Sequence, residues 1–383
     1  MNKNCTFKLS IAAIAASLLV TACGGGGGSD SSAATGKPAS GAGTTAPASG
    51  AGTGSPGNSG STAPSTGTSP ATSIPASTYD GASFEAAAFK QLNDYRVAMG
   101  VGALKQDPVL DTSAQAHARY MYTALKAQTT TTLSHDEVAG NKNYYGDTPL
   151  ARARKAGAPS NEWISEIIGA GASQTTAADA AADCIGQALD TVYHLVDVTF
   201  NQEAIGFGYQ PGEQSWPQYT CAADFGTYTG VSGSPGSNTD TYAGGQQIAT
   251  NTVVHAPLNN ENGVRLAMVP EAPNPATDLS APGHPIAVRV NSENFDTLSV
   301  SQFTLMESNG TQVAVRIMVP ASAHASSTAT TTADPNNLLP NGSAVLLPLA
   351  PLKANTTYTV TFNGARDGVT LPTATWSFTT GAK

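Results

Sequence analysis

Three residues of this sequence combine ionisable side chains with the surroundings of a polar site. His135, Glu166 and His194 each stand beside apolar residues, at the edge of a segment that reads as buried. Two imidazoles and a carboxylate brought to one cavity can hold a divalent metal ion or the polar head of a ligand. We therefore take these residues as candidate cavity residues, and as candidate ligands of Zn²⁺ or another divalent ion with an open fourth position.

The surrounding region predicts helices mixed with a few strands. Ser83, Asp107 and Thr148 can each cap a helix, the last two with a proline at the first helical position. A fourth helix is expected from about Thr176 to Val192. Strands are expected at residues 163–168, 204–209 and 219–225. This mixture favours a helix–sheet–helix sandwich in the α+β class.

Short motifs follow one another in a fixed order through this region. They are LNDYR at 92–96, LKQDPVL at 104–110, AQAHARYM at 114–121, SH at 134–135, GDTP at 146–149, EII at 166–168 and AIGFGY at 204–209. Their order and spacing resemble the CAP superfamily of cysteine-rich secretory, antigen 5 and pathogenesis-related proteins, over residues 84–226. The resemblance implies an α-β-α sandwich at residues 80–229, with His135 and His194 at the two cavity histidines of that family.

The resemblance also implies two cavity glutamates, and only Glu166 matches one of them. Gly186 stands at the position of the other. Asp183, Asp190 or Glu137 could take its place, and spacing does not decide between them. His117, beside the apolar stripe of the second helix, is expected to pack in the core or to bond a neighbouring segment.

The resemblance implies a secreted binding module whose cavity holds a metal ion, a lipid, a sterol or another small ligand, without catalysis. A metal-assisted hydrolase of peptide or cell-envelope substrates is the alternative, with Glu137 as the nearest general base. Adhesion is a third alternative. Ser134-His135-Asp136 is not a catalytic triad, because adjacent residues cannot adopt triad geometry.

The first 78 residues predict export and anchoring. A basic stretch and a short apolar stretch within residues 1–22 predict a signal peptide. Cys23 after Thr21-Ala22 resembles the acylated cysteine of bacterial lipoproteins, which implies a lipid anchor in the membrane. Gly24 after it favours the outer membrane. Residues 23–78 are rich in Gly, Ser, Thr and Pro and predict a flexible tether.

Residues 251–383 predict a second domain made of strands, after a linker at 230–250. Tyr358, Val360 and Phe362 alternate with threonines, which is typical of a half-buried strand, and Trp376 and Phe378 indicate another. The ending resembles bacterial Ig-like domains, which implies a β-sandwich. Such a domain serves as a spacer or binds a protein partner.

Charge and cysteine content restrict the remaining possibilities. The formal net charge is −9, with no Lys/Arg run, which argues against nucleic acid as a partner and against electrostatic binding to anionic membranes. Cys5 lies in the signal peptide and Cys23 is assigned to the lipid, so Cys184 and Cys221 remain. In an oxidising envelope they predict a disulfide, with a reactive thiol or a zinc pair as the alternatives.

Overall fold

The computed structural model describes residues 67–172, 176–213, 215–231, 244–293 and 296–382. All of them belong to one compact unit, Ser61–Lys383. The predicted signal peptide, the acylation site at Cys23 and most of the tether lie outside the described residues. Among the helices of the described part, none is long and apolar enough to cross a membrane.

The first region is built on a four-stranded sheet in the order β1-β3-β4-β2. Its strands are β1 (Lys105–Gln106), β2 (Trp163–Gly171), β3 (Ala204–Pro211) and β4 (Tyr219–Thr227). Strand β4 runs antiparallel to both β2 and β3, and β1 pairs in parallel with β3. The three longer strands contain the three that the sequence predicts.

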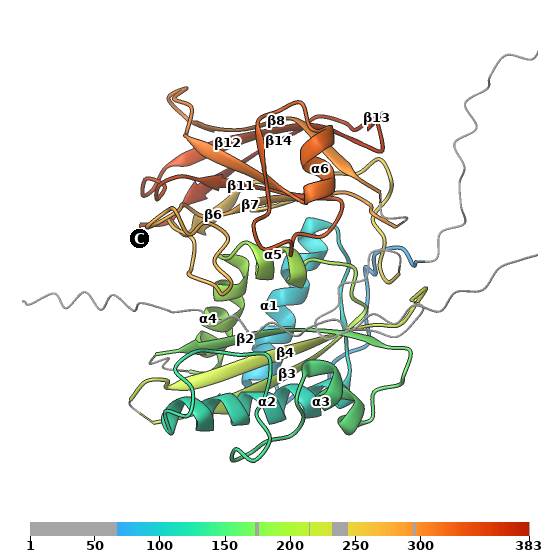
Figure 1. The fold of residues 1–383 in the computed structure, drawn as a ribbon, viewed down its shortest axis with the longest axis vertical. Coiled ribbons are helices and arrows are strands. Elements are labelled where there is room, and N and C mark those ends of the chain that lie inside the picture. The colour runs from blue at the N-terminus through green and yellow to red at the C-terminus, as the bar shows by residue number, and fades with distance from the viewer. Residues whose placement is uncertain (1–66, 173–175, 214, 232–243, 294–295, 383) are drawn as a thin grey trace, which may run out of the picture. The chain divides into compact units, whose positions relative to one another are not determined.

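Helices cover both faces of this sheet (Figure 1). Helices α2 (Pro108–Lys126) and α3 (Pro149–Ala156) lie on one face, and α1 (Phe84–Met99) and α4 (Ala177–Leu189) lie on the other. Strand β4 alternates accordingly: Cys221 and Ala223 belong to the core beneath α1 and α4, whereas Ala222 packs against α2. The observed layers are therefore α-β-α.

The helices begin where their caps predict. The side chains of Ser83, Asp107 and Thr148 accept hydrogen bonds from the first turns of α1, α2 and α3. Helix α4 ends at Leu189, earlier than predicted, and a separate short helix α5 (Tyr193–Val198) follows it. His194 therefore lies in the first turn of a helix that the sequence did not predict.

The second region is rich in strands, as predicted. One five-stranded sheet has the order β10-β9-β11-β7-β5. In the other, β13, β12, β14 and β6 follow one another and β8 pairs with β12. The elements are β5 (Val254–Ala256), β6 (Glu261–Val264), β7 (Ile286–Arg289), β8 (Leu298–Glu307), β9 (Val315–Val319), α6 (Ala321–Ser326), β10 (Thr331–Ala333), β11 (Ser343–Pro348), β12 (Thr357–Arg366), β13 (Val369–Thr370) and β14 (Ala374–Thr380). One core cluster contains buried residues of both sheets, including Val288, Leu346, Val360 and Phe378.

A further core cluster joins the two regions. Leu195 and Phe200, in and just after α5, pack in one cluster with Val254, Met318 and Val345 of the strand-rich region. A buried polar contact adds to it, since the Arg289 guanidinium donates to Asn201 Oδ1 at 2.8 Å and lies 4.2 Å from the ring centre of Phe200. Helix α5 is thus held between the helix-covered sheet and the strands that follow it in sequence.

Candidate functional site

A buried network of charges lies between α2, α3 and β2. The ring of His117, on α2, has a carboxylate at one nitrogen and a carbonyl at the other: Nδ1 is 3.0 Å from Glu137 Oε1, and Nε2 is 3.0 Å from the carbonyl oxygen of Ser134. With Glu137 ionised, both partners accept, so these contacts suit a ring that donates from both nitrogens. The prediction that His117 bonds a neighbouring segment is confirmed.

Arg152 and Glu166 complete this network. The Arg152 guanidinium donates to Glu166 Oε2 at 2.6 Å and to the carbonyl oxygen of His135 at 2.9 Å. Both side chains are fully buried. Burial alone would raise the pKa of Glu166, but the charges of His117 and Arg152 and the hydrogen bond from His135 hold that pKa well below its usual range. Glu166 is therefore ionised.

His135 contacts this network from its exposed side. Its Nδ1 lies 3.0 Å from Glu166 Oε1, and 31% of its side chain is exposed. With the carboxylate ionised, Nδ1 carries the proton in this hydrogen bond. In the contacts of the described residues, Nε2 of His135 has no hydrogen-bond partner. The structure thus brings two of the three predicted site residues into direct contact.

His194 is held by a different carboxylate, that of Glu271. The distance from His194 Nδ1 to Glu271 Oε2 is 3.2 Å, and Glu271 is 1% exposed against 22% for the histidine. The same nitrogen lies 3.3 Å from the Thr191 hydroxyl. Glu271 also accepts hydrogen bonds from the backbone N–H groups of Val192, at 2.6 Å, and Tyr193, at 3.1 Å. It thereby caps α5, whose own N-cap residue makes no side-chain hydrogen bond. Nε2 of His194 likewise has no partner among the described residues.

The two predicted histidines line the same two adjoining cavities. One measures about 400 Å³ and is lined mainly by apolar groups, among them Ile167, Ile168 and Ala188. The other measures about 270 Å³ and also includes Ser165 and Glu166. His135, His194 and Glu271 belong to both. They therefore stand where the apolar cavity meets the polar one.

The other acidic candidates lie elsewhere. Glu137 is buried against His117, and Asp183 accepts a hydrogen bond from the Tyr219 hydroxyl at 2.6 Å. Asp190 lies 3.3 Å from the Arg265 guanidinium and 3.2 Å from Nδ1 of His284. A side chain at Gly186 would meet open space, with no atom within 4 Å of its Cβ. The carboxylate that faces His194 comes instead from Glu271.

The disulfide prediction is confirmed: Cys184 of α4 and Cys221 of β4 are bonded, across a sequence separation of 37. Cys184 also lines the apolar cavity. The bond fixes one wall of the cavity to the central sheet.

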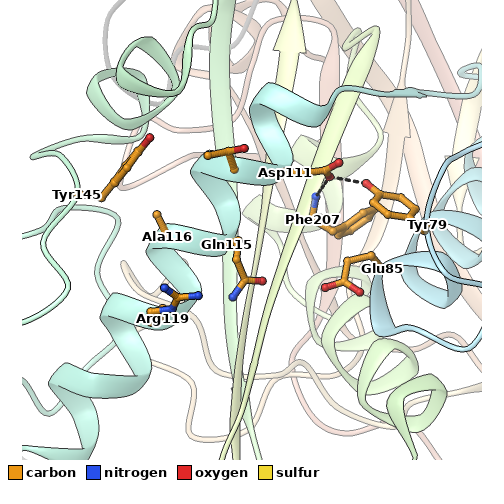
Figure 2. Close-up of a pocket in the computed structure, with 9 residues that line it drawn as sticks. Tyr79, Glu85, Asp111, Gln115, Ala116, Arg119, Tyr145 and Phe207 are labelled. Atoms are coloured by element: carbon orange, nitrogen blue, oxygen red, sulfur yellow. Dashed lines mark hydrogen bonds between the residues drawn. The ribbon is translucent and has the colours of Figure 1, made fainter.

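A third cavity, of about 560 Å³, lies on α2 away from both site histidines. Figure 2 shows the Tyr79 hydroxyl and the backbone N–H of Phe207 directed at Asp111. These donors lie 2.5 and 2.8 Å from Asp111 Oδ1. Burial, followed by the hydrogen bond to Asp111, raises the pKa of Tyr79. The Asp111 carboxylate of this cavity is therefore engaged by contacts within the protein.

Comparison with known proteins agrees with the layered fold of the first region. Residues 89–223 match the model of the family described as CAP, the cysteine-rich secretory protein family. Residues 89–223 form a CAP domain. Domains that match this model are generally extracellular. A comparison with curated proteins found no match.

A comparison with solved structures includes the crystal structure of selenomethionine PcoC, a copper resistance protein from Escherichia coli. The sequence identity is 16%, over 33% of this chain and 94% of that chain, with a TM-score of 0.18.

Arg152 and Glu271 were not predicted from the sequence, because each contacts the site only through the tertiary fold. His117 and Glu137 were both considered, but the sequence did not predict that they contact each other.

Proposed function

We propose that this protein is a ligand-binding protein of the cell envelope, whose CAP cavity holds a small ligand without transforming it. The observation that carries the proposal is the arrangement of His135 and His194. Each is held at Nδ1 by a buried carboxylate, and each faces cavities with both an apolar and a polar lining. A few fixed polar groups in a mostly apolar pocket are typical of small-molecule binding sites.

The buried groups favour binding over catalysis. A metal-assisted hydrolase would need a general base, and the nearest candidate was Glu137. Its carboxylate accepts hydrogen bonds from the backbone N–H groups of Tyr145 and Gly146 and contacts the His117 imidazolium. A base already engaged by three donors is poorly placed to take a proton from a substrate.

The predicted metal site has two available ligands. Both oxygens of Glu166 are engaged, by His135 and Arg152, so the carboxylate orients one imidazole and is not free to bind a metal. Within the described residues no group of three or more His, Cys, Asp or Glu is arranged to hold a metal ion. Two imidazoles are one short of the three protein ligands of a catalytic zinc site. The prediction of Zn²⁺ at His135, His194 and Glu166 stays a prediction.

The remaining parts of the chain fit a protein exposed outside the cytoplasm. We propose that Cys23 is acylated, that residues 23–78 form a tether to the outer membrane, and that the strand-rich region is an Ig-like sandwich. A disulfide between Cys184 and Cys221 supports an oxidising compartment. The shared core of the two sheets supports a sandwich.

Metal analysis and ligand binding test the site together. We expect residues 61–383, purified from an oxidising compartment, to bind small amphiphiles, and we expect the His135→Ala/His194→Ala variant to lose that binding by about tenfold or more. His255→Ala serves as the control, because His255 lies in β5 and lines neither cavity. Binding and metal content that both survive the double substitution would refute the proposed site.

A further inference from the structure

The cavity has a wall that does not belong to the CAP domain. Val269, Pro270, Glu271 and Ala272 line the apolar cavity, and they lie beyond the residues that match the family. This wall is fastened to the helices beside it. The Val269 N–H donates to the carbonyl oxygen of Asp190 at 2.9 Å, and Glu271 caps α5.

Glu271 determines what His194 can offer to a ligand. The carboxylate accepts two backbone N–H groups and lies 3.2 Å from Nδ1 of the imidazole. The Thr191 hydroxyl, which donates to the carbonyl oxygen of Ala188, lies 3.3 Å from the same nitrogen. Both neighbours accept from Nδ1, so that nitrogen keeps its proton. In the neutral ring, Nε2 is then a hydrogen-bond acceptor. Glu166 does the same for His135. The two imidazoles present acceptor nitrogens to one site.

The charges around the site disfavour an anion. Within the network, Arg152 and the His117 imidazolium offset Glu166 and Glu137. Among the described residues, the partners of Glu271 are His194 and the backbone N–H groups of Val192 and Tyr193, with no lysine or arginine. No lysine or arginine is among the described residues that line either cavity. A buried carboxylate near two acceptor nitrogens favours a positively charged group that donates hydrogen bonds.

The adjoining cavity is suited to an apolar chain. Ile167 and Ile168 of β2, Ala188 of α4 and Pro270 of the added wall line it, and Trp216, which is 62% exposed, also belongs to its lining. Its volume of about 400 Å³ lies in the range of small-ligand sites. The polar cavity begins where this one reaches His135 and His194.

We propose that the site binds a cationic amphiphile, with a primary ammonium head between the two imidazoles and an alkyl chain in the apolar cavity. Glu271, from outside the CAP domain, is the positioning residue that sets this preference. The inference rests on the proposed function of the cavity and adds to it the class of ligand and the residue that selects it.

Binding of octylamine and of octanoate to residues 61–383, measured by calorimetry at pH 7.5, tests the proposal. We expect octylamine to bind at least about tenfold more tightly than octanoate, because an anionic head meets the Glu271 charge. Glu271→Gln should remove most of this difference. The matched control is Asp278→Asn, an exposed carboxylate of the same segment that pairs with Arg316 and lines neither cavity; it should leave both affinities unchanged.

A spectroscopic measurement covers the case in which Glu271→Gln fails to fold. Nitrogen NMR of the unsubstituted protein should show the His194 proton on Nδ1, and a proton on Nε2 instead would overturn the proposal. Equal binding of the two octyl compounds, or tighter binding of octanoate, would overturn it too.

The variant Ala188→Phe distinguishes failure of the proposed ligand class from failure of the proposed cavity function. The larger side chain fills the apolar cavity, so it should abolish binding of either compound. If octylamine binds Ala188→Phe unchanged, or binds neither protein, the cavity function itself fails. If Ala188→Phe blocks binding but Glu271→Gln leaves the preference for octylamine intact, only the ligand class and the role of Glu271 fall.

Discussion

Replacing Arg152 with methionine should strongly lower the free energy of unfolding, because the Arg152 side chain is buried and paired with a buried carboxylate. Its guanidinium is fully buried and lies 2.6 Å from Glu166 Oε2. Methionine fills much of the volume but leaves Glu166 with the imidazolium of His117, 3.7 Å away, as its nearest charged partner. Removing one member of a buried ion pair costs about 3–5 kcal/mol, and we expect a loss of that size in the free energy of unfolding.

The pH dependence of this loss follows from Glu166. Its pKa is depressed in the folded protein, so its contribution to stability is present above the pKa of the unfolded chain, about 4.3, and declines only in stronger acid. Without Arg152 the folded pKa rises, and the variant can relieve the unpaired charge by binding a proton. The difference in stability between the two proteins should therefore narrow as pH falls from 7.5 to 5.

Urea denaturation followed by tryptophan fluorescence measures these differences. Arg154→Met is the matched control, because Arg154 lies on the same helix but donates only to carbonyl oxygens, of Ser160 and Glu162; it should cost less than about 1 kcal/mol. Arg152→Met/Glu166→Gln should recover part of the loss, since both charges are then gone. If Arg152→Met costs no more than Arg154→Met, the network does not carry the energy assigned to it.

Three other substitutions give independent checks. Replacing Cys184 and Cys221 with alanine should lower the free energy of unfolding by about 4 kcal/mol, from the entropy of the loop they close, and a loss below about 1 kcal/mol in urea titrations would contradict that origin. Burial raises the pKa of Glu162 to about 7, so its ionisation opposes folding as pH rises from about 4.5 through 7. Glu162→Gln should therefore raise the free energy of unfolding more at pH 8 than at pH 5. Urea midpoints that shift equally at the two pH values would exclude this. Tyr79→Phe removes the hydrogen bond to Asp111 and should cost about 1–3 kcal/mol in thermal unfolding, whereas an unchanged melting temperature would show that solvent replaces it.

The sequence predicts those parts of the fold that depend on neighbours in the chain. Ser83 and Thr148 each cap a helix within three residues of themselves, so their helices could be placed from local pattern alone. Val360 and Phe362 of β12 alternate in burial with the threonines between them, as their spacing predicted.

Burial of charge was beyond local pattern. Arg152 is followed two residues later by Arg154, and nothing in the neighbouring sequence distinguishes one arginine from the other. Only the fold shows that one of them faces Glu166 and the backbone of His135, while the other donates to a loop. The sign and size of a charged residue's contribution depend on partners that lie far away in sequence.

The start of helix α5 and the carboxylate beside His194 could not be predicted from the sequence for the same reason. The residue before it, Val192, has a side chain that cannot cap a helix, so no local signal marks its start. The missing acceptor comes from Glu271, 79 residues further along the chain, and the same carboxylate holds His194. The resemblance implied a glutamate at the position of Gly186, whereas the carboxylate facing His194 comes from Glu271, outside the residues that match the family. The element that could not be predicted and the residue proposed to select the ligand are thus explained by one long-range contact.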